Sequence, residues 1–258
     1  MILEVCVDDI AGLDAAVAGG GDRIELCAAL ALGGLTPSPS LIAAAKTVPI
    51  PVHLLARPRE GGFHYTARES AMIAADLAAA SDAGLAGVVI GASRPDHTLD
   101  TDLLAALVAH ACALGAARGT PLSLTLHRAI DLCADMPTAL DTAIALGFER
   151  ILTSGGEPKA IDGIAMLATL HRRAAGRITI LAGSGIDAGN AAQIIATGVG
   201  EVHASCGSLV ASDTNDGPSP SPARERLFGF AAAARRQTDA TCVRNLKAVL
   251  QKTVGQVA

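Results

Sequence analysis

The sequence has very few aromatic side chains. Among its 258 residues there is no Trp, one Tyr and four Phe, and the formal net charge is −5. Nucleic-acid binding favours a basic surface, and binding of single strands also uses aromatic rings on which bases stack. The composition therefore predicts a protein that does not bind nucleic acid.

The sequence also lacks the patterns of export and membrane insertion. The first ten residues, MILEVCVDDI, have no basic start and no long apolar run, both of which mark a signal peptide. The longest apolar stretch of helical character lies between Asp102 and Arg118. We expect it to be too short and too rich in Ala to span a membrane. The sequence thus predicts a soluble, cytoplasmic protein without membrane contact.

Cysteines are present but never clustered. They stand at positions 6, 27, 112, 133, 206 and 242, and no CxxC occurs. In a reducing cytosol such scattered cysteines are expected to stay free thiols. A lone cysteine in a helix-like stretch, such as Cys112 or Cys242, is typical of a small core hydrophobe.

Half of the residues are apolar, mostly aliphatic, so the chain can bury a large core. Short β-type runs alternate eight times with Ala-rich helical stretches. This alternation predicts a parallel sheet, and eight repeats in about 250 residues are typical of a (β/α)8 TIM barrel. A doubly wound open sheet is the alternative, but no GxGxxG follows the first strand. The predicted strands cover residues 2–7, 23–26, 52–56, 88–90, 123–126, 150–152, 179–181 and 201–204.

We expect a single α/β domain over residues 1–258, with the barrel in about 1–210. The next stretch, 211–223, is rich in Ser, Pro, Asp and Gly and is predicted to be a loop. Two additional C-terminal helices are predicted within 224–256, one around 224–236 and one around 239–254.

The first two predicted strands each carry a carboxylate and a thiol at alternate positions. Glu4 and Cys6 lie in ILEVCV, and Glu25 and Cys27 lie in RIELCAAL. Alternate residues of a barrel strand face the lumen, and a Glu among the aliphatic side chains of the helix side would be costly to bury. We therefore predict that all four side chains line the lumen and cluster, because neighbouring strands lie about 4.8 Å apart.

Other strands carry polar residues with the same alternation. The barrel interior is therefore expected to be unusually polar, since layers of Val, Ile and Leu are the norm. A buried ion network of Glu4, Glu25, Arg23 and Arg57 is the structural alternative, although buried charges are a poor source of stability. The further polar positions are His53 with Arg57, Thr125 with His127, and Glu201 with His203 and Ser205.

Three further segments indicate a site. LTLHRAID offers His127 as a proton shuttle and Asp131 as its orienting partner. ARPREGGFHY offers Arg57 beside a glycine pair. The glycine-rich turns LAGSGI and ASCGS, at the carboxyl ends of strands seven and eight, are predicted to cradle an anion. The backbone positions proposed for this role are Gly183, Gly185, Ser205 and Gly207.

Taken together, these segments resemble the CutC family, named for copper homeostasis. The matching stretches include EVCVDDI, GDRIELCAALALGGLTPS, PVHLLARPREGGFHY, LTLHRAIDLCADM, GFERILTSGGEPKAIDGI, LAGSGI, EVHASCGS and, near the end, DATCVRNLKAVL. Residues 211–236 depart from the pattern. The resemblance implies a cytoplasmic TIM barrel that handles copper, Cu(I) binding at the positions of Cys6 and Cys27, and a homodimer.

Two functional hypotheses follow, and whether the protein is an enzyme stays open. The first is Cu(I) binding by Cys6 and Cys27, because soft thiolates suit Cu(I). The second is an enzyme acting on a small anionic or phosphorylated substrate without an organic cofactor. There Glu25 or His127 would be the base, Glu4 and Asp131 would complete the acid/base group, and Arg57 with the glycine-rich turns would hold the anion. A non-catalytic oligomeric scaffold explains the polar lumen least.

Overall fold

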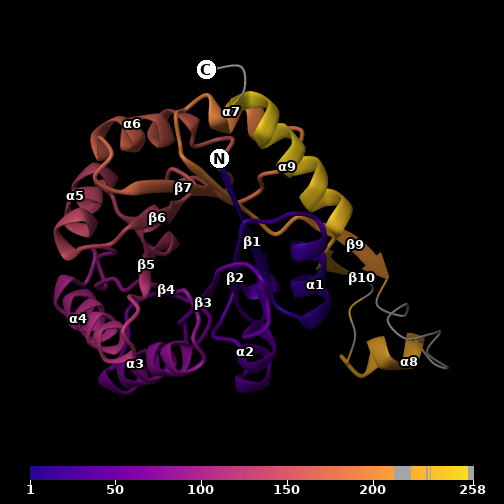
Figure 1. Cartoon of the computed structure of the whole chain (residues 1–258), viewed down its shortest axis with the longest axis horizontal. Coiled ribbons are helices and arrows are strands. Elements are labelled where there is room, and N and C mark those ends of the chain that lie inside the picture. The colour runs from indigo at the N-terminus through magenta and orange to yellow at the C-terminus, as the bar shows by residue number, and fades with distance from the viewer. Residues whose placement is uncertain (212–221, 231, 233, 255–258) are drawn as a thin grey trace.

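The computed structural model describes residues 1–211, 222–230, 232 and 234–254. Eight parallel strands form a closed barrel in sequence order, and the first strand pairs with the eighth (Figure 1). The predicted TIM-barrel class is confirmed, and each predicted strand lies within two residues of an observed one. The strands are β1 Ile2–Val7, β2 Arg23–Leu26, β3 Val52–Leu55, β4 Gly87–Ile90, β5 Ser123–Leu126, β6 Arg150–Thr153, β7 Thr179–Gly183 and β8 Glu201–Ala204.

Helices surround the barrel (Figure 1). Several begin at side-chain caps that the sequence supplies: Asp9 accepts from the Gly12 amide, and Thr66 and Glu69 form a capping box, which satisfies amides without helical partners. The helices are α1 Ile10–Ala18, α2 Pro39–Ala45, α3 Ala67–Asp82, α4 Thr101–Arg118, α5 Met136–Leu146, α6 Ile164–Ala174, α7 Ala191–Ile195 and α9 Ala240–Val254, with 3-10 turns η1 Leu30–Leu32 and η2 Arg128–Leu132.

Helix α4 is long and apolar enough to cross a membrane by length and composition alone, which differs from the expectation that this stretch is too short. In the structure α4 packs between α3 and α5 in the helical ring. Its Leu104, Leu107 and Ala111 are buried in the core between barrel and helices, so one face of the helix packs on the barrel.

The chain after β8 does not continue as the sequence predicts. Gly207–Ala211 forms strand β9, which pairs antiparallel with β10, Ala234–Thr238. The helix predicted over 224–236 is therefore wrong beyond Leu227, where α8, Pro222–Leu227, ends. Residues 234–238 have only a weak helix preference. By pairing with β9 they gain backbone hydrogen bonds, which favour the strand. The second predicted helix, around 239–254, is confirmed by α9. Most of the predicted loop, 211–223, lies outside the described residues.

Residues of the barrel strands alternate between two environments. In β1, Leu3, Val5 and Val7 join the large core between barrel and helices, so the intervening Glu4 and Cys6 face the lumen. A separate, small apolar cluster of Cys6, Cys27, Leu55 and Val89 fills part of that lumen. The barrel therefore holds two cores of different character.

Candidate functional site

A chain of ion pairs crosses the amino-terminal half of the lumen. Arg23 Nε lies 2.5 Å from Glu4 Oε2, and the same guanidinium pairs with Glu201. Arg150 Nε lies 3.4 Å from a Glu201 oxygen. The structural alternative considered from sequence is thus correct for Glu4 and Arg23, but their network continues to Glu201 and Arg150 rather than to Arg57.

Glu4 also holds the imidazole ring of His203 through a hydrogen bond. His203 Nδ1 donates to Glu4 Oε1 at 2.8 Å, and both side chains are buried. Burial favours neutral Glu4, but the hydrogen bond from His203 and the charge of Arg23 hold its pKa well below the usual range. Burial likewise opposes charge on His203, yet Cys6, Glu25 and Glu4 raise its pKa well above the usual range. The pair is a buried imidazolium–carboxylate contact.

Three potential metal donors converge next to this pair. One ligand atom each from Cys6, Glu25 and His203 lies within 4.8 Å of the other two, and all three residues are buried. Burial and the charge of Glu4 raise the pKa of Glu25 to about 7, although His203 and Arg23 oppose the rise. His203 was absent from the predicted site residues. The alternation of EVHAS predicts that His203 faces the lumen with Glu201, but it does not show that His203 meets Cys6 and Glu25.

Cys27 lies beside this cluster without joining it. Its Sγ donates to the Val7 carbonyl oxygen at 3.2 Å, and it packs with Cys6, Leu55 and Val89. Burial, and then the charge of Glu25, raise the pKa of the Cys27 thiol well above its usual range. Cys27 is therefore held as a neutral thiol.

At the carboxyl end of β5, His127 is a buried, neutral ring. Its Nδ1 accepts the Ala129 amide at 3.1 Å, which leaves the proton on Nε2. Burial and the nearby charge of Arg57 lower the His127 pKa to about 3. The ring packs against Gly91, where a Cβ would lie 2.3 Å from it, and against Phe63 at 4.6 Å between centroids.

Asp131 does not perform the predicted role of orienting His127. Its carboxylate accepts from Thr153 Oγ1 at 2.5 Å, from the Ser154 amide and hydroxyl, and from Arg128 Nε at 2.7 Å. These bonds tie η2 to the loop after β6. Asp131 is a positioning residue for that loop.

The Arg57 guanidinium donates most of its hydrogen bonds to backbone carbonyls. Its NH1 donates to the Leu32 and Gly34 carbonyls at 3.0 and 2.7 Å, and its NH2 donates to the Gly61 carbonyl at 3.0 Å. The guanidinium thus joins the loops after β2 and β3. Only its buried Nε has no hydrogen-bond partner among the described residues.

The residues of the glycine-rich turns after β7 and β8 each have a local packing or pairing role. A Cβ at Gly183 would lie 2.5 Å from Leu152 Cδ1 and 3.3 Å from His203 Cβ, so this glycine makes room for lumen side chains. Gly185 has a positive φ and packs over Lys159. Ser205 leads directly into β9, whose first residue, Gly207, pairs with Thr238.

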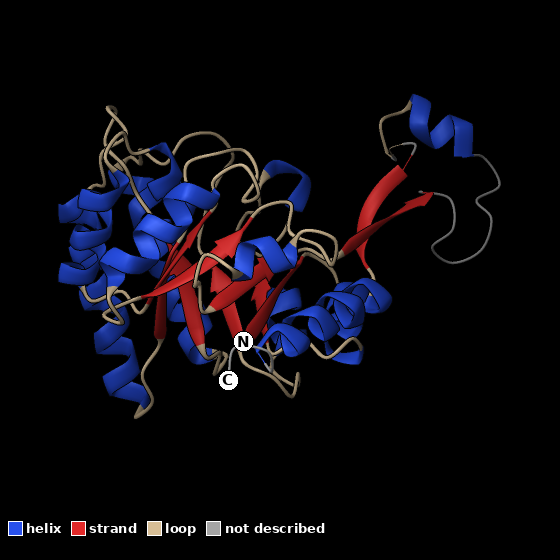
Figure 2. Ribbon diagram, turned by 90° about the horizontal axis from the view of Figure 1, so that it is seen from above, coloured by secondary structure: helices blue, strands red, loops and turns tan. Residues whose placement is uncertain are grey.

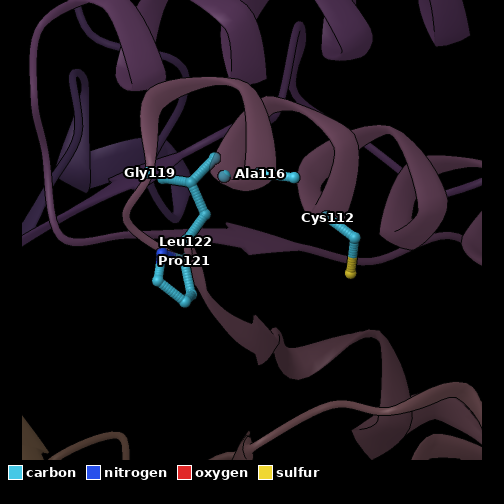
Figure 3. Close-up of a pocket in the computed structure, with 6 residues that line it drawn as sticks. Cys112, Ala116, Gly119, Pro121 and Leu122 are labelled. Atoms are coloured by element: carbon cyan, nitrogen blue, oxygen red, sulfur yellow. The ribbon is translucent and has the colours of Figure 1, made fainter.

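A surface hollow lies at the opposite end of the barrel, where α4 ends and the chain enters β5 (Figure 3). It offers no paired titratable groups. Its lining consists of Cys112, Gly115, Ala116, Gly119, Pro121 and Leu122.

Comparison with known proteins places the chain in a family. The CutC family model matches residues 1–208. A CutC family protein of Sinorhizobium medicae is 48% identical over 251 residues, covering 97% of this chain and 96% of that one. One from Caulobacter vibrioides is 50% identical over 211 residues, covering 81% and 83%. A solved structure named "Putative Copper Homeostasis Protein CutC from Streptococcus agalactiae" has a TM-score of 0.72 and 31% identity, and the match covers 80% of this chain and 98% of that one. The eight-stranded barrel with its Glu-x-Cys doublets therefore belongs to the CutC family.

Proposed function

We propose that the protein binds Cu(I) in the barrel lumen, with Cys6 as the central ligand and His203 Nε2 as its partner. The supporting observation is the convergence of Cys6, His203 and Glu25 within 4.8 Å. Glu4 holds the other ring nitrogen of His203 at 2.8 Å. Such a carboxylate–histidine contact is the arrangement that orients imidazole ligands in metal sites.

The donor chemistry fits a soft ion. Thiolate and imidazole both suit copper, whereas the carboxylate of Glu25 is a harder ligand. Glu25 would serve mainly as a counter-charge and proton acceptor. Because His203 Nε2 must release its proton before it can bind a metal, copper binding is expected to strengthen as the pH rises.

The second thiol, Cys27, remains part of the proposal in a secondary role. The family resemblance points to Cys6 and Cys27 together, and the two side chains share one apolar cluster. Cys27 would need to give up its bond to the Val7 carbonyl and lose a strongly held proton. We therefore assign it to reinforcing the site after copper has bound Cys6.

An anaerobic titration of Cu(I) against a competing chelator tests the proposal. Cys6→Ser and His203→Gln should each abolish stoichiometric binding. Cys27→Ser is the matched control, since it changes a neighbouring buried thiol, and should weaken binding only modestly. Equal loss in Cys6→Ser and Cys27→Ser would instead support a two-thiolate site. Undiminished binding in Cys6→Ser would refute the lumen site.

A second candidate function is acid/base catalysis on a small anionic substrate. The observation that favours it is a pair of groups with opposite pKa shifts: Glu25, with a pKa of about 7, and neutral His127, with a pKa of about 3. A carboxylate poised near neutrality can act as a general base, and a neutral histidine can donate a hydrogen bond to a developing oxyanion. Screening Glu25→Gln and wild type for exchange of α-protons of small 2-oxo acids into D2O would test it; equal rates in both would count against it.

We also propose a cytoplasmic homodimer. The arm formed by β9, α8 and β10 extends away from the barrel (Figure 2) and carries four exposed apolar side chains: Leu209, Leu227, Phe228 and Phe230. Exposed apolar side chains gathered on one arm favour self-association. Sedimentation of the wild type and of Phe228→Ser/Phe230→Ser across a range of concentrations would test it, and a monomeric wild type would overturn it.

A further inference from the structure

Buried polar atoms without a hydrogen-bond partner concentrate in one sector of the barrel. Among the described residues, four of these atoms lie on β3 and β5 or directly after those strands. Each belongs to a side chain that is at least nine-tenths buried. They are His53 Nδ1, Arg57 Nε, Thr125 Oγ1 and His127 Nε2.

Three of these groups face the lumen, and two of them, Arg57 and His127, meet at its carboxyl-terminal end. Thr125 and His127 are alternate residues of β5 and its extension, so they share the lumen face. Arg57 and His127 both contact the ring of Phe63, with the guanidinium 5.3 Å and the imidazole 4.6 Å from its centre. The Arg57 charge also acts on His127 strongly enough to lower its pKa.

All three groups can act as donors. Arg57 Nε–H belongs to a permanent cation, and His127 Nε2 carries its proton because Nδ1 accepts the Ala129 amide. The Thr125 hydroxyl can rotate to donate. Leaving such donors buried without partners is unfavourable, and native proteins rarely do so without a functional reason.

We propose that this sector, defined by Arg57, Thr125 and His127, binds a small oxyanion beneath Phe63. The ligand must be small because Leu55 and Val89 already fill the neighbouring lumen. A carboxylate or phosphate would supply acceptor oxygens to all three donors and a charge to the guanidinium. None of these residues is a proposed copper ligand, so this site is separate from the copper site and does not depend on it.

Phe63 forms the cover of the site. Its ring is only partly buried and lies between Arg57 and His127, while its carbonyl oxygen accepts the Ser93 amide at 2.9 Å. The backbone of the cover is thus fixed while the ring stands at the solvent boundary.

The test uses NMR of 15N-labelled protein titrated separately with oxalate, pyruvate and orthophosphate. We expect at least one anion to shift the His127 Nε2–H resonance in a saturable manner. Shifts by oxalate or pyruvate alone identify a carboxylate site, and a shift by orthophosphate alone identifies a phosphate site. No shift with any of the three would overturn the proposal.

Thr125→Val provides the sharper measurement because it removes the hydroxyl with little change of shape. It should weaken anion binding about tenfold, the effect of losing one hydrogen bond to a charged acceptor. The same variant should be more stable than wild type without ligand, since an unpartnered polar atom is gone. Unchanged anion affinity in Thr125→Val would contradict the proposal.

Thr153→Val is the matched control on the neighbouring strand. Thr153 is equally buried, but its hydroxyl donates to Asp131. The control should lose stability and keep its anion affinity. Cys6→Ser should also keep that affinity, so that failure of the copper proposal and failure of the anion site give different results.

Discussion

His203 Nδ1 and Glu4 Oε1 lie 2.8 Å apart and join the last strand of the barrel to the first. The two residues are direct partners in the register of β1 and β8. Their contact links the ion-pair chain of the lower lumen to the Cys6 cluster above it. It therefore makes the charge state of the candidate copper site depend on the closure of the barrel.

Replacing Glu4 by Gln should weaken both the fold and the copper site. The variant keeps the shape but removes the buried charge that contacts both His203 and Arg23, which should cost about 3 kcal/mol of unfolding free energy. Copper affinity should fall about 10- to 100-fold, the usual effect of losing a group that orients a ligand. Urea denaturation and Cu(I) competition measure the two effects. Asp141→Asn, on an exposed pair with Arg173, should change neither.

His127 should contribute a loss of stability in mild acid. Its folded pKa of about 3 lies below the ordinary histidine value of 6.5, so the unfolded chain takes up the proton first as the pH falls. The stabilising contribution of His127 is fully present above about pH 6.5. It declines toward pH 3 by an amount on the order of 4 kcal/mol. His127→Phe should flatten the decline between about pH 6.5 and 4.5 in urea titrations. An identical slope in wild type and variant would show that His127 does not titrate in this way.

Gly183→Ala should be destabilising for a steric reason. The new Cβ would lie 2.5 Å from Leu152 Cδ1, and overpacking of this kind typically costs about 1–3 kcal/mol. Thermal and urea unfolding measure the loss. Gly62→Ala is the control, because nothing lies within 4 Å of its Cβ position, and it should be close to neutral. If both variants unfold like wild type, the lumen near His203 is looser than the structure indicates.

Asp131→Asn should destabilise the loop after β6 without altering His127. The amide would present a donor to the Thr153 hydroxyl and the Ser154 amide, and unsatisfied buried donors should cost about 3 kcal/mol in unfolding free energy. The 15N signals of His127 should still show a neutral ring protonated at Nε2. A change of tautomer would instead restore Asp131 to the orienting role that the sequence suggested.

The eight strands could be predicted because each is a short aliphatic run followed by a break in the pattern, and the alternation within ILEVCV and RIEL placed Glu4 and Glu25 in the lumen. The partner of Glu4 could not be predicted, because the contact with His203 depends on the register between strands 199 residues apart. The region after β8 was mispredicted for a similar reason. The 234–238 segment has no strong strand pattern and becomes a strand only by pairing with β9.

The long sequence separation between Glu4 and His203 affects how the barrel forms during synthesis. Glu4 and Arg23 emerge early from the ribosome, whereas His203 and Glu201 follow almost two hundred residues later. Domains generally fold as units during synthesis, and this barrel leaves its first strand with incomplete charge compensation until the eighth strand is made. Chains that terminate before β8 should therefore lack the His203 partner of Glu4 and keep only its ion pair with Arg23.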